Sequence, residues 1–308
     1  MGSCALCPFC CSGCVGAQVK SYLDLTKTGI VVFVLLSAMA GYFLSFPSGG
    51  VFLLSHLGLF LLGLYMVSAG SFALNQAQEW ARDAVMERTK ARPIPAGKMK
   101  PWQAWGLGVL LVAAGSLLLY WIEPLSAYLG LLTVLLYNGF YTLFWKRKWT
   151  FGAVPGAIPG AMPAVIGFSV HSVDLLAPEC VYLFLIMFLW QMPHFWCLAI
   201  RYRDDYRLGG FPVLASVLGT DKTLFHIGLY VLVYIGVALV SPWFVKTHVL
   251  YLFLVVPFAL KVLWEFYLYY RQEAKGSWIR FFLLVNFSLL AFMGAPVFDR
   301  LLVSLFGG

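Results

Sequence analysis

The sequence predicts an all-α, polytopic membrane protein with nine transmembrane helices. Of its 308 residues, 61% are hydrophobic and only 11% are charged, whereas ordinary soluble domains carry about 25% charged residues. The mean hydropathy is +0.85. Nine apolar runs are long enough for a bilayer core, which a helix crosses with about 20 residues. Together these observations exclude a fold whose core is surrounded by water.

The nine predicted spans follow one another with short polar connections. The fifth is the least regular because Pro155, Pro159 and Pro163 interrupt it, and such a helix is kinked or packed closely against its neighbours. The expected spans are residues 28–46, 51–74, 102–121, 125–144, 151–170, 180–199, 225–244, 249–270 and 280–298.

The basic residues predict the orientation of the chain. When the nine spans are threaded in order, all but three of the 21 Lys and Arg residues fall on the side of the N-terminus. The exceptions are Lys246, Arg300 and the intramembrane Lys261. Cytoplasmic loops carry such an excess. We therefore expect a cytoplasmic N-terminus and an external C-terminus. We also expect the membrane to be the bacterial inner membrane. The net charge of +8 then needs no nucleic-acid partner.

Five of the seven cysteines lie within the first fourteen residues. Their spacing is compatible with a zinc or iron–sulfur site, and Cys4 with lipidation, but no histidine or second cysteine pair completes a familiar metal motif. We expect residues 1–20 to form a disordered cytoplasmic tail and residues 21–308 to form one nine-helix domain. The cysteines are Cys4, Cys7, Cys10, Cys11 and Cys14.

A polar segment follows the second predicted span. Asn75, Glu79 and Asp83 are four residues apart, so on a helix they lie along one face over about 12 Å. Arg88 and Arg92 come directly afterwards. Oxygen ligands followed by cations suit a divalent metal ion that carries a phosphorylated substrate. The alternative is a solvated helix end with charges at helical spacing.

A second acidic cluster follows the sixth predicted span. Asp204 and Asp205 are flanked by Arg201, Arg203 and Arg207. The threading places both acidic segments at the same face of the membrane, where they would converge on one or two Mg²⁺ ions, because Mg²⁺ takes one or two carboxylates plus phosphate oxygens. The alternative is that each aspartate pairs with a neighbouring arginine at the surface.

The two polar segments resemble a known family. Residues 75–93 are similar to the first Asn/Asp-rich motif of the UbiA-type intramembrane prenyltransferases, and residues 204–212 to the second. Within that superfamily, residues 22–27, 152–160 and 192–199 resemble the protohaem IX farnesyltransferases. The resemblance runs over nearly the whole chain. It departs from the pattern at Glu79, where aspartate is usual, and it leaves open which of the two adjacent aspartates binds metal.

The resemblance implies a reaction. Farnesyl diphosphate, with Mg²⁺, alkylates a vinyl group of haem B, water adds, and haem O and diphosphate are formed. Haem A synthase or a terminal oxidase under assembly would be the protein partner. The alternatives are another UbiA-type prenyltransferase acting on an aromatic acid such as 4-hydroxybenzoate or on a quinone precursor, a lipid or porphyrin transporter, and a structural oxidase subunit.

The resemblance also implies roles for single residues. His194 stands out from the residues as well, because an ionisable group inside a span indicates a functional site, although a structural histidine bonded to a neighbouring helix is the alternative. The implied metal ligands are Asn75, Glu79, Asp83 and Asp205, and Asp204 joins them in the catalytic set. The implied diphosphate ligands are Arg88, Arg92, Arg147, Lys148 and Arg203. The haem-pocket candidates are His194, Trp196 and Asn138.

Overall fold

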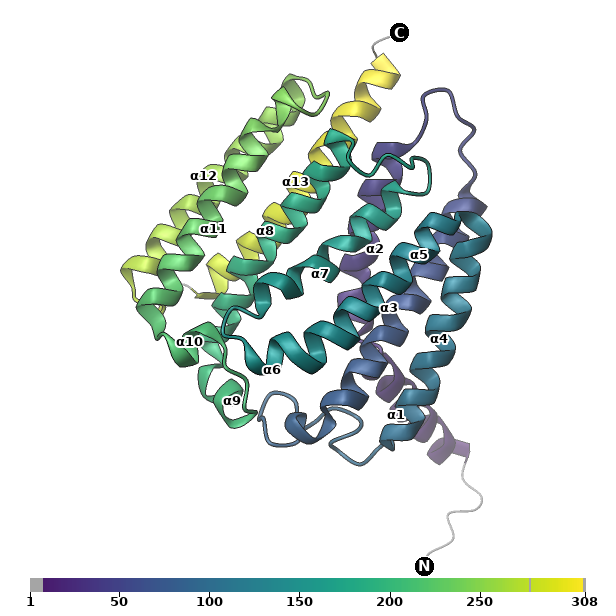
Figure 1. The fold of residues 1–308 in the computed structure, drawn as a ribbon, viewed down its shortest axis with the longest axis vertical. Helices are drawn as coiled ribbons and strands as arrows, with labels where there is room; N and C mark the ends of the chain where they lie inside the picture. Colours follow the sequence, from purple (N-terminus) through teal and green to yellow (C-terminus); the bar gives the residue numbers. More distant parts are fainter. Residues whose placement is uncertain (1–7, 277, 307–308) are drawn as a thin grey trace, which may run out of the picture.

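The protein is a bundle of long helices that run up and down between two loop-bearing ends (Figure 1). The computed structural model describes residues 8–276 and 278–306. The elements are α1 (Pro8–Leu25), α2 (Thr28–Ser45), α3 (Leu54–Asp83), α4 (Pro101–Ile122), α5 (Pro124–Val134), η1 (Leu135–Trp145), α6 (Lys146–Lys148), α7 (Ala153–Phe168), α8 (Pro178–Arg201), α9 (Arg203–Leu208), α10 (Leu214–Val217), α11 (Thr220–Val240), η2 (Ser241–Trp243), α12 (Val249–Arg271) and α13 (Trp278–Phe306).

Eight helical segments of the described chain are long and apolar enough to cross a membrane, so this is an integral membrane protein. They correspond to eight of the nine expected spans. The one expected span without such a segment is the fifth, which corresponds to α7. This helix has only 16 residues and contains Pro159 and Pro163. At 1.5 Å per residue it is about 24 Å long. The count of nine spans therefore stays a prediction that depends on α7.

The segment Pro124–Lys148 crosses as one unit but changes its helical geometry halfway. It begins as an α-helix with Pro124 in its first turn, a position where proline is well tolerated. Leu135–Trp145 then forms a π-helix of 11 residues, whose i→i+5 bonds fit more residues into each turn. Side chains that follow this π-helix consequently point in directions that an α-helical pattern does not predict.

Glycines bring neighbouring helices into close contact. On α3, Gly70 lies opposite Gly108 of α4, and a Cβ atom added to Gly70 would stand 2.7 Å from the Gly108 carbonyl oxygen. Between α2 and α7, Gly167 lies against the Ala38 backbone. Small residues at such positions let helix backbones approach closely inside a membrane. The site-bearing helix α3 is fixed in place by this packing against α4.

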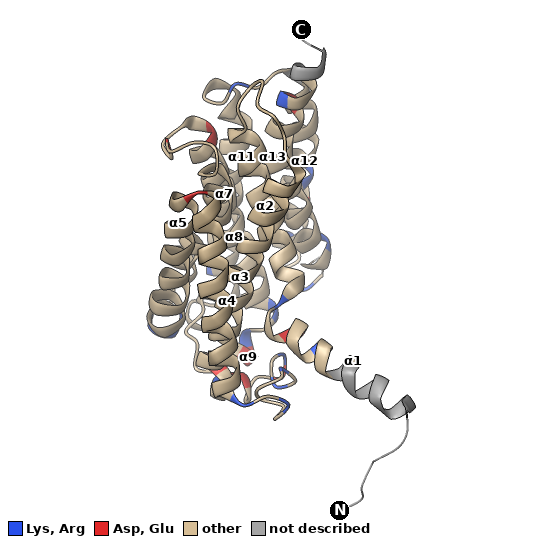
Figure 2. Cartoon of the chain, turned by 90° about the vertical axis from the view of Figure 1, so that its right-hand side faces the viewer, with Lys and Arg blue, Asp and Glu red and all other residues tan. Residues whose placement is uncertain are grey.

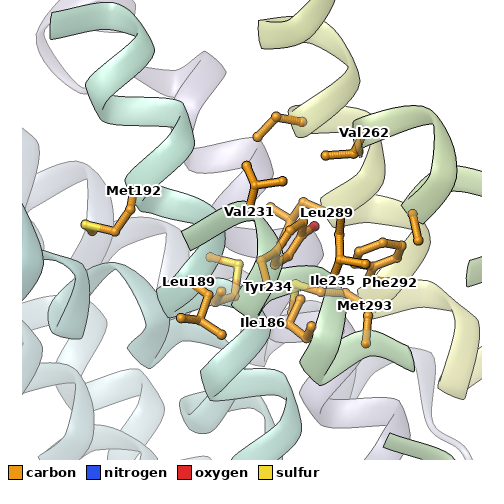
Figure 3. Close-up of a cluster of buried hydrophobic side chains, with 14 of the residues drawn as sticks. Ile186, Leu189, Met192, Val231, Tyr234, Ile235, Val262, Leu289, Phe292 and Met293 are labelled. Atoms are coloured by element: carbon orange, nitrogen blue, oxygen red, sulfur yellow. The ribbon is translucent and has the colours of Figure 1, made fainter. Parts of the chain in front are cut away.

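The larger hydrophobic core lies among α8, α11, α12 and α13. Figure 3 shows Ile186, Val231, Tyr234 and Phe292 pointing into the same space from three of these helices. All four are fully buried. This core holds α8 and α13 together beside the cavity described below.

Most of the charged connecting segments lie at one end of the bundle. The loops 84–100, 149–152, 209–213 and 272–276, with α6, α9 and α10, all lie at the end opposite the C-terminus (Figure 1). Figure 2 shows charged residues near α9 and the adjoining loop at this end. The expectation that the two acidic segments share one end is confirmed by this chain path.

The N-terminal segment extends away from the bundle as α1 (Figure 2). Residues 8–20 are thus helical, which differs from the disordered tail expected from the sequence. Residues 1–7, with Cys4 and Cys7, lie outside the described residues, as do the side chains of Cys10, Cys11 and Cys14. The division of the chain near residue 20 and the roles of these cysteines stay predictions.

Candidate active site

The polar face of α3 lies inside the protein. Asn75, Glu79 and Asp83 are 2%, 2% and 1% exposed, respectively, and all three line one large cavity. They follow one another at single-turn intervals, as the sequence predicted. Because a buried carboxylate is costly unless it is paired, the partners of these two acids define the site.

The cavity has a volume of about 750 Å³ and two chemically different parts. Its polar part is lined by the α3 ladder together with cationic side chains from three other segments. The remaining walls are mainly apolar and come from α2, η1, α7, α8 and α13. This volume falls within the range of ligand pockets, about 300–1,000 Å³. The arrangement suits a ligand with a charged head and a long apolar body.

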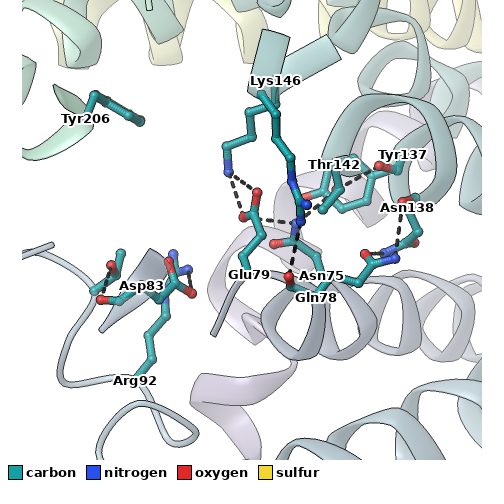
Figure 4. A network of polar contacts seen from close by, with 12 residues as sticks. Asn75, Gln78, Glu79, Asp83, Arg92, Tyr137, Asn138, Thr142, Lys146 and Tyr206 are labelled. Atoms are coloured by element: carbon teal, nitrogen blue, oxygen red, sulfur yellow. Dashed lines mark hydrogen bonds and ion pairs between the residues drawn. The ribbon is translucent and has the colours of Figure 1, made fainter. Parts of the chain in front are cut away.

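Lys146 holds the carboxylate of Glu79. Its Nζ donates to both carboxylate oxygens, at 2.9 and 2.7 Å. The Asn75 Nδ2 donates to Glu79 Oε2 at 3.2 Å and to Thr142 Oγ1 at 3.0 Å. Figure 4 shows these groups converging between α3 and the end of η1. Glu79 is thus a buried anion that forms an ion pair with Lys146.

Asp83 has its own cationic partner. Arg92 Nη1 donates to Asp83 Oδ2 at 2.6 Å, and the Arg92 side chain is 25% exposed. The Thr89 hydroxyl donates to the Asp83 backbone carbonyl at 2.9 Å. The loop 84–100 therefore folds back over the end of α3 and brings Arg92 to the ladder.

Lys27 adds a third cation. It precedes α2 in a left-handed backbone conformation, and its Nζ donates to Asn75 Oδ1 at 3.2 Å. Burial, together with the charges of Arg92 and Lys146, lowers the pKa of the Lys27 amino group to about 7. Cations that repel one another at a cavity wall are stabilised by a bound anion.

Asp205 lies outside this cavity in contact with the loop. Its carboxylate accepts backbone N–H bonds from Glu87 at 3.3 Å and Arg88 at 3.0 Å. The Arg88 guanidinium lies over the rings of Tyr202 and Tyr206, 5.1 Å from each centroid. Asp205 thus fixes the loop that carries Arg92. Its predicted role as a metal ligand stays a prediction.

The structure separates the predicted diphosphate ligands. Arg88 and Arg92 line the cavity. Arg147 instead donates to the Gln78 carbonyl at 3.2 Å, Lys148 lies over the Phe144 ring, and Arg203 lies 3.8 Å from Asp204 on the surface. Lys27 and Lys146 also line the cavity, although neither is among the site residues predicted from the sequence.

Two of the three haem-pocket candidates line the cavity and one does not. His194 and Trp196 line the cavity. Asn138 is absent from the lining; it accepts a bond from the Ser71 hydroxyl at 2.6 Å and donates to the Ser71 carbonyl at 3.0 Å. Asn138 therefore ties η1 to α3, as polar side chains do between helices inside a membrane.

The acidic ladder has donors that suit Mg²⁺. No group of three or more His, Cys, Asp or Glu residues converges within the described chain. Mg²⁺ does not require one, because it takes one or two carboxylates and completes its octahedral shell with water and substrate phosphates. Glu79 and Asp83 are such carboxylates, buried beside the cavity. The donor set therefore fits Mg²⁺ bound together with a diphosphate.

Comparison with known proteins shows the family of the chain. Residues 34–290 match the UbiA prenyltransferase family. The chain belongs to this family. A protoheme IX farnesyltransferase from Bdellovibrio bacteriovorus is 51% identical to this UbiA protein over 283 residues, which cover 92% of this chain and 97% of that one.

Solved structures share the fold of this UbiA protein. A UbiA homologue from Aeropyrum pernix K1 superposes with a TM-score of 0.71 at 17% identity, covering 89% of this chain and 98% of that one. A homologue from Archaeoglobus fulgidus, bound to DMAPP and Mg²⁺, gives a TM-score of 0.64 at 14% identity and covers 90% and 99% of the two chains. The all-α UbiA architecture expected from the sequence is confirmed.

Proposed function

We propose that this prenyltransferase is a haem O synthase. The bond between C1 of farnesyl diphosphate and its oxygen breaks, and the electron pair leaves with diphosphate. The π electrons of a haem B vinyl group form the new carbon–carbon bond. The carbon next to the macrocycle takes the oxygen of one water molecule and releases one proton. The 51% identity to a protoheme IX farnesyltransferase over most of both chains supports this substrate pair.

The observation that carries the proposal is the division of the cavity. Its polar part gathers Lys27, Lys146 and Arg92 around two buried carboxylates, and the rest is mainly apolar. A diphosphate fits the first part and an isoprenoid chain fits the second. A site for a small polar substrate would not need the long apolar wall.

The cations of the polar part hold the departing diphosphate. Lys146 and Arg92 are positioned by Glu79 and Asp83, so they need little reorganisation as charge develops on the leaving group. We propose Mg²⁺ as the cofactor, held by Glu79 and Asp83 with the Asn75 amide oxygen nearby. When bound, it would neutralise charge on the diphosphate oxygens. The Archaeoglobus fulgidus homologue bound to Mg²⁺ supports this choice.

Aromatic and apolar walls stabilise and shield the allylic cation that forms when the bond between C1 and the diphosphate oxygen breaks. Tyr137 and Tyr141 line the cavity beside the polar part, and their rings stack 5.7 Å apart. An aromatic face stabilises a nearby cation. Apolar walls keep water away until the new bond forms.

We further propose that the charged end of the bundle faces the bacterial cytoplasm, across the inner membrane. Basic loops at that end support this orientation. Farnesyl diphosphate would then enter from the cytoplasm, and haem O would pass to haem A synthase or to a terminal oxidase under assembly.

A reconstituted reaction tests the function. The purified protein is incubated with haem B, farnesyl diphosphate and Mg²⁺, and the porphyrin products are analysed by mass spectrometry. We expect haem O, and no product when Mg²⁺ is chelated. A parallel reaction replaces haem B with 4-hydroxybenzoate. Prenylation of 4-hydroxybenzoate without conversion of haem B would contradict the proposal.

A further inference from the structure

His194 is a rigidly held imidazole in the apolar part of the cavity. It lies on α8 between two aromatic rings, with its centroid 4.7 Å from that of Trp190 and 4.8 Å from that of Phe282. Trp190 is itself fixed, because its Nε1 donates to the Val285 carbonyl of α13 at 3.0 Å. The ring is therefore clamped between α8 and α13, and it lines the cavity.

One nitrogen of this ring is left unsatisfied. His194 Nδ1 is buried and has no hydrogen-bond partner among the described residues. A buried polar atom without a partner costs about 1–3 kcal/mol, and such atoms need an explanation when they persist. Asn286 of α13 is the polar neighbour of the ring and also lines the cavity. A polar pair in a mainly apolar wall indicates a specific ligand there.

His194 is the imidazole that this cavity offers to a haem iron, beside lining methionines and tyrosines. The chain has five histidines. Among the described residues that line the cavity, His194 is the sole histidine, and cysteine is absent. Neutral imidazole is the commonest protein ligand for haem iron. The lysines of the lining belong to the polar part, where Glu79 and Asn75 engage them.

His194 lines the same cavity as the acidic ladder. The residue lies seven positions before Arg201, the last residue of α8, which is about 10 Å along the helix axis. Asn75, at the inner end of the acidic ladder and eight positions before Asp83 on α3, lines the same cavity. A porphyrin held at His194 would therefore share the cavity with a farnesyl diphosphate held at the acidic ladder.

We infer that His194 is an axial ligand of the iron of the haem substrate and orients the macrocycle for alkylation. The inference rests on the proposed function. A ring nitrogen donates its lone pair to the iron, the oxidation state of the iron does not change, and the same bond breaks when the product leaves. Trp190 and Phe282 set the plane of the imidazole, and hence the tilt of the macrocycle.

The test is spectroscopic and separate from turnover. Full-length protein in lipid nanodiscs is titrated with haem B without farnesyl diphosphate, and the bound haem is examined by optical absorption and by resonance Raman spectroscopy of the ferrous form. The wild type is expected to show an iron–histidine stretching band. In His194→Ala this band is lost and haem binds about tenfold more weakly or worse, and free imidazole restores the nitrogen-ligated spectrum.

His226→Ala is the matched control. His226 also packs against aromatic rings, Phe151 and Trp196, but it is absent from the cavity lining, so its replacement should leave the haem spectrum unchanged. The thermal unfolding midpoint of each variant shows that the bundle is intact.

An unchanged haem spectrum in His194→Ala, or loss of the band in His226→Ala, would overturn the inference. So would a wild type that makes haem O while its bound haem lacks a histidine ligand. A wild type that neither binds nor converts haem B would overturn the proposed function itself.

Discussion

At the scale of single residues, the site is organised around buried charges in pairs. Glu79 and Lys146 form one pair, and Asp83 and Arg92 the other. Breaking a buried pair by removing one partner costs about 3–5 kcal/mol, whereas removing both charges costs far less. Activity and stability should therefore respond differently to single and double substitutions.

The Glu79–Lys146 pair gives the first prediction. Lys146→Met leaves a buried carboxylate unpaired, so we expect a clear fall in the thermal unfolding midpoint and loss of activity. The double variant Glu79→Gln/Lys146→Met should recover most of the midpoint and stay inactive, because both a metal ligand and a diphosphate ligand are missing. Differential scanning fluorimetry and the haem O assay measure the two effects. Recovery of activity in the double variant would show that the pair is structural only.

There is a physical reason why Lys146 could not be predicted as a site residue from the sequence. Lys146, Arg147 and Lys148 are consecutive, and only the geometry of the preceding helix decides which one faces the cavity. The π-helix Leu135–Trp145 changes that geometry, so Lys146 reaches Glu79 while Arg147 turns to the backbone of α3. For Asn75, Glu79 and Asp83, the spacing of four residues was enough to predict that they share one face, because α3 is a regular α-helix.

At the scale of elements, the short helix α9 fixes the loop 84–100 above the cavity. Asp205 receives two backbone N–H groups of that loop, and hydrogen bonds to a charged group contribute about 1.5–3 kcal/mol. The acidic residues near Asp205 could be recognised in the sequence. Their contact with a loop backbone more than 100 residues earlier could not, because it depends on the path of the loop.

Replacement of Asp205 separates two roles. Asp205→Ala removes both acceptors, so we expect faster tryptic cleavage within the loop 84–100 and a KM for farnesyl diphosphate raised about tenfold, equivalent to about 1.4 kcal/mol. Asp205→Asn keeps one acceptor oxygen, so trypsin should cleave its loop 84–100 more slowly than that of the alanine variant. Equal cleavage of both variants and the wild type would contradict the positioning role, and an inactive but protease-resistant Asp205→Asn would indicate a metal ligand.

The contact between α2 and α7 gives a prediction about packing. A Cβ atom at Gly167 would overlap the Ala38 backbone, and overpacking costs about 1–3 kcal/mol. Gly167→Ala should lower the thermal unfolding midpoint in detergent. Gly58→Ala is the control, because Gly58 has open space around its Cα and alanine favours a helix. A Gly167→Ala midpoint equal to that of the control would contradict this close contact.

At the scale of the whole molecule, composition and charge were sufficient to predict the architecture, a bundle of membrane-spanning helices. Hydropathy identified the eight long spans, since a bilayer demands about 20 apolar residues per helix. The short helix α7 is harder to classify as a membrane span. Its prolines interrupt the helix, and it packs against α2 and α8, so it lacks a long uniform apolar run. The cavity could not be predicted from the sequence, because its lining residues come from many separate segments between Lys27 and Leu290.

The orientation of the molecule is tested by cysteine labelling. In a variant without native cysteines, Lys98→Cys lies in the loop 84–100 at the charged end and Leu176→Cys lies at the opposite end, where Leu176 is 84% exposed. A membrane-impermeant maleimide applied to intact spheroplasts should label position 176 only, and position 98 after permeabilisation. The reverse pattern would place the charged end outside.

The central claim is that one cavity joins a farnesyl chain and water to a haem vinyl group. It is tested most directly by running the complete reaction in H₂¹⁸O and following the porphyrin by mass spectrometry. We predict a haem product that carries one farnesyl group and one ¹⁸O-labelled hydroxyl group, formed together with one diphosphate and lost in Asp83→Ala. A farnesylated haem without the labelled oxygen, or full activity of Asp83→Ala, would contradict the account.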